Sequence, residues 1–269
     1  MKFLIQKING EIRHDFSFAL LESIRFKNWL NRNDKKDKIS VKFISTPELL
    51  EPDDIYPVTE FKPLHKDYTP VGSVEFVIEF LQHFYGLTPK PINVPECLFD
   101  VRYSQRPIKN GNHMDFENII GGKYFVKSND KIKGFAEVIE LKEREALPIP
   151  AGNYQVSQFI NNIYSEWRAF VYENKLVGLQ NYAGEFTKFP NIWRIDDMII
   201  TYEKSGTAPV AYTLDVGVNE YHTFIIEAHD FFSVGLYGFA DYTKLPHMLN
   251  KWFHQYIQRE MVLNKKHTG

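Results

Sequence analysis

The chain has 269 residues, and its 32 lysine and arginine side chains nearly balance 34 aspartate and glutamate side chains, for a formal net charge of −2. This length accommodates one large domain or a few small lobes with a substantial core. The near-neutral charge excludes the broad basic field typical of nucleic-acid-binding proteins, so we predict no nucleic-acid partner.

Cysteine content and hydropathy narrow the class further. Cys97 is the only cysteine, which excludes intrachain disulfides and cysteine metal clusters. No apolar run approaches the length of a membrane span, and residues 1–8, broken by Lys7, do not resemble a signal peptide. We therefore expect a cytoplasmic protein without a membrane partner.

The first 96 residues alternate between strand-like and helix-like patterns, which predicts a small α/β lobe that ends in a proline-rich linker over residues 88–95. A helix start is also expected at Thr46-Pro47-Glu48, before an irregular segment over residues 51–70. The predicted elements are a strand over residues 1–8, a helix from Asp15 or Ser17 to about Leu30, a strand over residues 41–44, and a helix opened by Gly72-Ser73 and ended by Gly86. The side chains expected to be buried in these helices are Ala19, Leu20, Ile24, Trp29, Val74, Val77, Ile78, Leu81, Phe84 and Tyr85.

After the linker, strand patterns dominate until a closing amphipathic helix over residues 241–262. A tight turn at Glu173-Asn174 joins two of the strands. The predicted strands cover residues 98–103, 123–126, 135–141, 154–159, 166–172, 176–180 and 195–202. The side chains of the closing helix expected to face inward are Leu245, Leu249, Trp252, Tyr256 and Ile257.

The most informative stretch is a predicted β-hairpin near the end of the chain. Two alternating apolar runs, residues 212–218 and 223–228, are interrupted by Asp215 and Glu227 where a plain buried strand would carry Val or Ile. A three-residue loop over residues 220–222 would place these two carboxylates directly opposite each other.

His229 lies two residues beyond Glu227 and therefore on the same face, with Asp230 at the end of the strand. Facing carboxylates repel unless a cation lies between them, and a divalent ion such as Mg²⁺ with oxygen ligands is the simplest cation to expect. The alternative is that Asp215 and Glu227 face solvent on a half-exposed sheet.

Two further polar groups carry positive charge. The loop of residues 127–134 contains Lys127, Lys131 and Lys133 and ends in Gly134, as suits a flap over phosphate oxygens. The alternative is a solvated hairpin tip, which is favoured for Lys131 and Lys133 singly, whereas Lys127 directly follows a strand and is held closer to the sheet.

Glu166 and Arg168 form the last group, two residues apart on one predicted strand and so on one face. If that face lines a cleft, Arg168 can hold a phosphoryl or carboxylate oxygen in a bidentate contact. The alternative is an exposed ion pair that contributes almost no stability.

The usual nucleotide fingerprints G-x-x-x-x-G-K-[ST] and G-x-G-x-x-G are absent, as are K-x-D-G, H-E-x-x-H and G-x-S-x-G. However, three segments taken in order resemble the ATP-grasp superfamily: FVKSNDKIKGF, then QFINNIYSEWRAFVYENKLVG, then LDVGV with FIIEAHDFFSVGLYGF. The resemblance covers roughly residues 98–239 and looks closest to a bacterial and phage clade predicted to be peptide-ligase-like.

The resemblance implies an α+β protein with an ATP-grasp fold. In this fold two α+β lobes grip ATP, and here a small α/β lobe would precede them. The implied domains are residues 1–96 for the N-terminal lobe and 97–269 for the ATP-grasp domain, the latter divided into about 97–160 and 161–269.

The resemblance also implies roles for individual residues. Lys127 matches a lysine on the nucleotide phosphates, and Arg168 an arginine beside the γ-phosphate and the acyl group; both are catalytic candidates. This chain departs from the family at His229, where an asparagine is usual, so either His229 or Asp230 completes the metal set. The other implied contacts are the hinge Gln158-Phe159-Ile160 to adenine, Lys133 and Glu166 to ATP, and Asp215 and Glu227 to Mg²⁺.

The implied activity is an ATP- and Mg²⁺-dependent carboxylate–amine ligase that forms an amide through an acylphosphate, on a small-molecule, amino-acid or peptide substrate. Three alternatives stay open: a phosphotransferase or ATPase on the same fold, an inactive ATP-binding interaction protein, and a structural α/β protein without a nucleotide site. The substrates and the oligomeric state stay open too. The cleft candidates chosen by residue type alone are Arg102, Arg106, Tyr182 and Arg194.

Overall fold

The computed structural model describes residues 1–34, 38–47, 59–220, 222–232 and 234–267. The chain forms two compact units, each described by itself below. Unit 1 comprises residues 1–88, 209–211 and 231–269, and unit 2 comprises residues 89–208 and 212–230. The predicted division into residues 1–96 and 97–269 stays a prediction about domain organisation.

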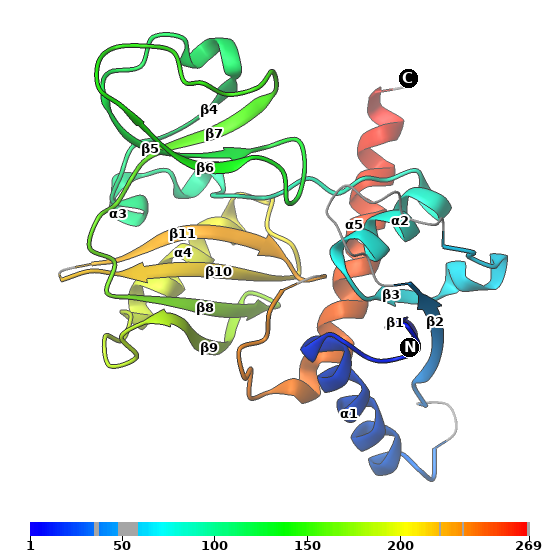
Figure 1. Cartoon of the computed structure of the whole chain (residues 1–269). Coiled ribbons are helices and arrows are strands. Elements are labelled where there is room, and N and C mark those ends of the chain that lie inside the picture. Colours follow the sequence, from blue (N-terminus) through cyan, green and yellow to red (C-terminus); the bar gives the residue numbers. More distant parts are fainter. Residues whose placement is uncertain (35–37, 48–58, 221, 233, 268–269) are drawn as a thin grey trace. The chain divides into compact units, whose positions relative to one another are not determined.

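Among its described residues, unit 1 contains a parallel three-stranded sheet in the order β2-β1-β3 and three α-helices (Figure 1). The central strand contributes the fully buried side chains Phe3, Leu4 and Ile5. The strands are β1 (Lys2–Ile8), β2 (Ser40–Thr46) and β3 (Thr69–Val71), and the helices are α1 (Asp15–Leu30), α2 (Val74–Tyr85) and α5 (Leu245–His267).

Helix α2 has the predicted limits. The Ser73 hydroxyl accepts a hydrogen bond from the Phe76 N–H at 3.2 Å, and Gly86 ends the helix with a φ of 66°, which glycine adopts without strain. Helix α5 begins a few residues later than predicted and buries Trp252, as expected. The helix start expected at Thr46-Pro47-Glu48 runs into residues 48–58, which lie outside the described residues.

Trp29 was expected in the core, but it is 59 % exposed and stacks on Phe26 and the Arg32 guanidinium. The buried stripe of α1 follows Ser17, Leu20 and Ile24. Trp29 lies five residues beyond Ile24, which at roughly 100° per residue rotates it about 140° away from that stripe.

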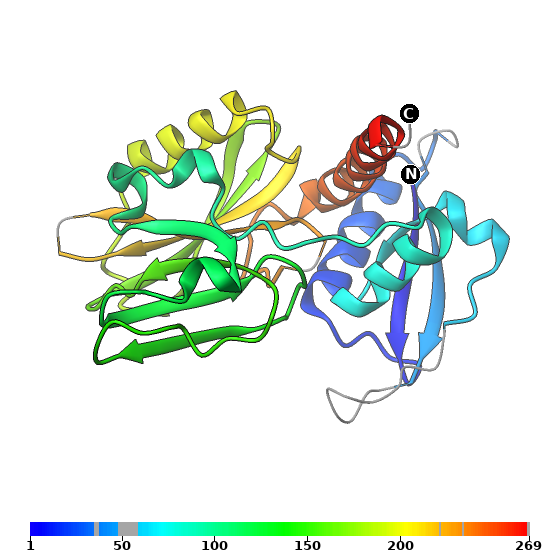
Figure 2. The same cartoon turned by 90° about the horizontal axis from the view of Figure 1, so that it is seen from above.

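Unit 2 contains two four-stranded sheets (Figures 1 and 2). The first, in the order β4-β7-β5-β6, is antiparallel and packs around a core that includes Val126, Tyr154 and Val156. Its strands are β4 (Ile108–Asn112), β5 (Gly122–Ser128), β6 (Ala136–Leu141) and β7 (Asn153–Gln158).

The second sheet has the order β11-β10-β8-β9, and α4 covers one of its faces. Leu214 and Val216 of β10 pack with Ile195 and Met198 of α4 in one core. The elements are α3 (Val101–Ser104), β8 (Ser165–Tyr172), β9 (Lys175–Gly184), α4 (Ile192–Lys204), β10 (Ala211–Val218) and β11 (Thr223–Asp230).

Two predicted strands are wrong. Residues 98–103 end a 3₁₀ turn and enter the short helix α3, because the Asp100 carboxylate accepts the Arg102 N–H at 2.9 Å and caps a helix. Residues 195–202 lie in α4, whose buried side chains repeat with helical spacing: Ile195, Met198, Ile199 and Tyr202.

Strands β3 and β4, which are both short, were not predicted. The predicted turn at Glu173-Asn174 is confirmed by positive φ values of 48° and 63°. None of the helices among the described residues is both long enough and apolar enough to span a membrane.

Candidate functional site

The predicted pairing of Asp215 with Glu227 is confirmed, although the loop prediction is wrong. The ladder begins at Val218 and Thr223, so four residues, rather than three, separate the strands. A register shift then leaves Ile226 unpaired between Ile225 and Glu227, and this β-bulge restores the Asp215–Glu227 pair.

The bulge decides which side chains face the site. Along β10, Leu214 and Val216 enter the core beneath α4, so Asp215 points to the opposite face. In β11, Ile225 and Ala228 enter the same core although they are three residues apart, because the bulge adds one residue between them. Glu227 therefore shares the face of Asp215.

Asp215 is 2 % exposed and is held by Arg168 of the neighbouring strand β8. The guanidinium donates from Nε to Oδ1 at 2.8 Å and from Nη2 to Oδ2 at 2.7 Å, a bidentate contact. Burial alone would raise the pKa of Asp215, but the interactions with Arg168, together with those of His229, outweigh it and hold that pKa below its usual range. The alternatives of a solvent-facing Asp215 and an exposed Glu166–Arg168 pair are therefore wrong.

Glu227 has its own cation, Lys127, which comes from the end of β5 in the other sheet of unit 2. The ammonium forms an ion pair with Glu227 Oε2. Burial lowers the pKa of Lys127 to about 8, against the opposing influence of the Asp215 charge. The two carboxylates thus lie between two cations contributed by different sheets.

Asn93, which sequence reasoning missed, fastens these sheets together. Its carbonyl accepts the Ala228 N–H at 2.7 Å, while its side-chain amide donates to the Ser128 carbonyl at 3.0 Å and to Asn129 Oδ1 at 2.7 Å. Ala228 directly follows Glu227 and Ser128 directly follows Lys127, so Asn93 fixes the spacing of that ion pair. An asparagine within a proline-rich linker gives no sequence signal for such a role.

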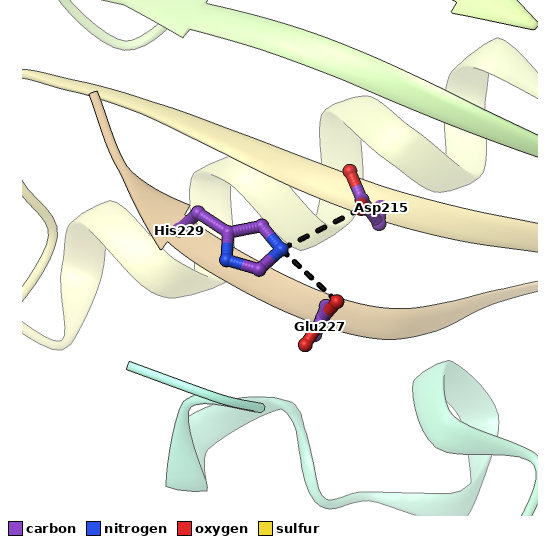
Figure 3. Close-up of side chains that lie close together, drawn as sticks. All are labelled: Asp215, Glu227 and His229. Atoms are coloured by element: carbon purple, nitrogen blue, oxygen red, sulfur yellow. Dashed lines mark ion pairs between the residues drawn. The ribbon is translucent and has the colours of Figure 1, made fainter. Parts of the chain in front are cut away.

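His229 completes the cluster on β11. Its Nε2 lies 3.0 Å from Glu227 Oε1 and 3.6 Å from Asp215 Oδ2, and Figure 3 shows the ring directed at both carboxylates. One ligand atom from each of Asp215, Glu227 and His229 lies within 4.8 Å of the others, a geometry that can hold a metal ion. Asp230 is next in the strand, faces the other way and does not join this group.

The surroundings of one buried atom, His229 Nε2, indicate whether these residues can bind a metal ion. Among the described residues, His229 Nε2 is buried without a hydrogen-bond partner, and it points at two carboxylates. Two carboxylate oxygens and a nitrogen lone pair form a donor set that suits a divalent cation. The residues present therefore fit a metal ion.

A pocket of about 150 Å³ lies beside this cluster and is lined mainly by apolar side chains, including Phe125 and Ile226. The predicted hinge Gln158-Phe159-Ile160 forms part of its wall. The Gln158 N–H donates to the Pro107 carbonyl at 3.2 Å and the Phe159 N–H to the Lys123 carbonyl at 2.8 Å. Within the described part of the chain the Ile160 N–H makes no hydrogen bond, so it is available to a ligand.

Glu166 also lines this pocket. The Tyr182 hydroxyl donates to Glu166 Oε2 at 2.8 Å, and the Tyr182 ring lies under the Arg168 guanidinium, 5.6 Å from ring centre to carbon. The predicted shared face of Glu166 and Arg168 is thereby confirmed, with Tyr182 between them. Burial and the nearby carboxylates raise the pKa of Tyr182, so it stays a hydroxyl donor.

Arg106, chosen from sequence only as an arginine in the right region, is 7 % exposed and borders the same pocket. Its guanidinium donates to the carbonyls of Ile225 at 2.8 Å and Ile226 at 3.2 Å, the two residues at the bulge. Burial lowers the pKa of Arg106 to about 10. Arg106 thus stabilises the backbone irregularity that sets the position of Glu227.

The remaining candidates lie outside this cluster. Lys131 and Lys133 are exposed on a turn whose Asp130 carboxylate accepts the Asn153 N–H at 2.8 Å. Arg102 and Arg194 are surface residues that pair with neighbouring aspartates: Asp100 at 3.7 Å and Asp197 at 3.6 Å.

Comparison with known proteins gives the family. Residues 103–245 match the model of the ATP-grasp domain, R2K clade family 2. The chain belongs to this family. No curated protein sequence matches the chain.

Solved structures of this fold confirm the predicted architecture. A D-alanine–D-alanine ligase from Bacillus anthracis complexed with ATP is 14 % identical, with 97 % of this chain and 99 % of that chain covered and a TM-score of 0.50. N5-carboxyaminoimidazole synthetase from Staphylococcus aureus is 10 % identical, with 93 % and 78 % covered and a TM-score of 0.51. The protein therefore has an ATP-grasp fold.

Proposed function

We propose that this protein is an ATP- and divalent-cation-dependent carboxylate–amine ligase that acts on an amino-acid or peptide substrate through an acylphosphate. One observation carries the proposal: Asp215 and Glu227 face each other on a buried sheet, each paired with a cation, beside an apolar pocket. Membership of the ATP-grasp family supports it, as does the fold shared with a D-alanine–D-alanine ligase.

In this proposal the apolar pocket holds the adenine ring. The free Ile160 N–H would donate to a ring nitrogen, and Phe125 and Ile226 would contact the faces of the ring. Glu166, fixed by Tyr182 at the edge of the same pocket, is placed to accept hydrogen bonds from the ribose hydroxyls.

The four charged side chains would exchange partners when the ligand binds. Lys127 and Arg168 now neutralise the carboxylates that a cation would occupy. With a divalent metal ion bound by Asp215, Glu227 and His229, the side chains of Lys127 and Arg168 would become available to phosphate oxygens. These are the anions that their hydrogen-bond donors suit best. Lys133, on the exposed turn, would add a weaker contact.

Chemistry then depends on placing the substrate carboxylate in line with the γ-phosphate. The bound divalent ion would supply charge neutralisation at the β- and γ-phosphate oxygens. Arg168, released from Asp215 and still stacked on Tyr182, would be positioned to stabilise the charge that develops as the phosphoryl group moves to the carboxylate. An amine would then displace phosphate to form the amide.

Trapping of the acylphosphate tests the proposal. The protein is incubated with ATP, Mg²⁺ or Mn²⁺, hydroxylamine and pools of amino acids and short peptides, and both hydroxamate and ADP are measured. A ligase gives hydroxamate and ADP in equal amounts, and the Asp215→Asn variant gives neither. Phosphorylated product without hydroxamate would instead identify a phosphotransferase, and ADP that is independent of every acceptor would identify an ATPase.

A further inference from the structure

His229 gives the metal cluster a donor that the two carboxylates lack. Its Nε2 lies 3.0 Å from Glu227 Oε1 and 3.6 Å from Asp215 Oδ2, and all three ligand atoms lie within 4.8 Å of one another. The ring is anchored on β11 directly across from Thr213, in the same ladder that pairs Asp215 with Glu227. The position of the nitrogen is therefore fixed by the same sheet that fixes the oxygens.

The ion-pair contacts that the structure gives this nitrogen are with the two carboxylates of the proposed cation site. Within the described part of the chain, Nε2 is buried and makes no hydrogen bond. A buried polar atom without a partner costs stability unless a ligand satisfies it. Figure 3 shows the two dashed contacts converging on this one atom, so a cation placed between the carboxylates would also meet the imidazole.

Imidazole changes which cation the site favours. Mg²⁺ prefers oxygen donors in near-ideal octahedral geometry and gives up water reluctantly. First-row transition metals accept nitrogen donors readily, and among them Mn²⁺ keeps the preference for carboxylate and phosphate oxygens that a nucleotide site requires. A set of two carboxylates and one imidazole therefore suits Mn²⁺ better than Mg²⁺.

We infer that the cation site prefers Mn²⁺ over Mg²⁺, with His229 Nε2 as a direct ligand that determines this selectivity. The inference rests on the proposed function for the existence of the cation site, and it adds which ion the site selects and which residue makes the selection. Asp215 and Glu227 supply affinity for either ion. His229 supplies the difference between them.

Two measurements on the full-length protein test this inference. Pulsed electron paramagnetic resonance of bound Mn²⁺, in the presence of a non-hydrolysable ATP analogue, detects coupling to an imidazole ¹⁴N. Calorimetric titration with Mn²⁺ and with Mg²⁺ under the same conditions gives the ratio of the two affinities. Neither measurement depends on turnover.

The wild type should show ¹⁴N coupling and bind Mn²⁺ more tightly than Mg²⁺. His229→Asn should lose the coupling and lower the Mn²⁺/Mg²⁺ affinity ratio by about tenfold or more, because an amide oxygen replaces the nitrogen. His222→Asn, the same change at an exposed histidine directly before β11, should behave as the wild type.

Two different results would overturn the inference. If both ions bind, but wild-type Mn²⁺ lacks ¹⁴N coupling and the affinity ratio is unchanged in His229→Asn, then His229 is not a ligand and the proposed function stands. If neither ion binds to the wild type with or without the nucleotide analogue, the inference and the proposed function fail together. The wild-type spectrum decides the first case even if the variant folds poorly.

Discussion

Two regions of unit 2 carry clustered charge in opposite ways. In the hairpin β10–β11, Asp215 and Glu227 are largely buried and each is paired with a cation from another strand. In the turn after β5, Lys131 and Lys133 are exposed to solvent. Charge that is removed from water must be compensated by specific partners, whereas solvated charge needs none. This contrast is the basis for our proposal that ligand charge is recognised at the hairpin rather than at the turn.

The largest expected effect comes from removing one buried carboxylate charge. Asp215→Asn leaves Arg168, which is 8 % exposed, without its opposite charge, and we expect a loss of about 3 kcal/mol in the free energy of unfolding. Urea unfolding followed by circular dichroism measures it. As a matched control, Glu22→Gln breaks an exposed helix pair with Arg25 and should cost less than about 0.5 kcal/mol. Equal losses of stability in both variants would contradict the proposed difference between buried and exposed charge.

The bulge provides the next test. Arg106→Met keeps an unbranched apolar stem but removes the donors to the Ile225 and Ile226 carbonyls, and we expect a stability loss of about 2 kcal/mol. Because the bulge sets the position of Glu227, cation affinity should fall as well. Unchanged cation affinity in a folded Arg106→Met protein would show that the bulge holds its geometry without this arginine.

Nucleotide affinity separates the two groups of lysines. Lys127→Ala should weaken binding of an ATP analogue by roughly tenfold, because a partly buried ammonium contact is lost. The double variant Lys131→Ala/Lys133→Ala should weaken it less than about threefold. Fluorescence competition measures both, and Lys127→Arg, which keeps the charge, serves as the control. A larger effect from the double variant would move phosphate recognition to the turn.

The smallest expected effect is a pH dependence of folding stability, caused by the buried side chain of His65, which lies near two lysines. Burial, then Lys42 and Lys62, lower the pKa of His65 below 6.5, and its Nδ1 accepts the Lys62 N–H at 3.2 Å. The unfolded chain therefore binds a proton more readily, so stability is lost as pH falls below about 6.5. His65→Gln should flatten this loss, as measured by urea midpoints at pH 7.5 and 5.5. An unchanged slope would mean that His65 does not titrate in this range.

Much of the candidate site could be predicted because the residue patterns that indicate it lie within one strand or one hairpin. Charges that interrupt the alternating pattern of residues 212–230 gave the Asp215–Glu227 pair, and the spacing of Glu166 and Arg168 gave their shared face. The bulge at Ile226 was not predicted, and Arg106, which donates a hydrogen bond to the Ile226 carbonyl, lies 120 positions away in the chain. Asn93 escaped notice for the same reason, because its partners Ser128 and Ala228 are distant in sequence.

The errors in the fold have a related cause. Ile195, Met198, Ile199 and Tyr202 have helical spacing, but the β-branched residues and the surrounding strands favoured a strand. Trp29 was expected in the core, although its position five residues beyond Ile24 turns it away from the buried face of α1. Periodicity was more informative than residue type in both cases.

One measurement tests the central claim most directly: calorimetric titration of the wild type and of Asp215→Asn with ATP, with and without a divalent cation, at a temperature where both are folded. We predict saturable binding to the wild type that is strengthened by the cation, and no such cation effect in the variant. ATP binding to the wild type that is indifferent to the cation, or no binding at all, would contradict the assignment of the hairpin as the metal–nucleotide site.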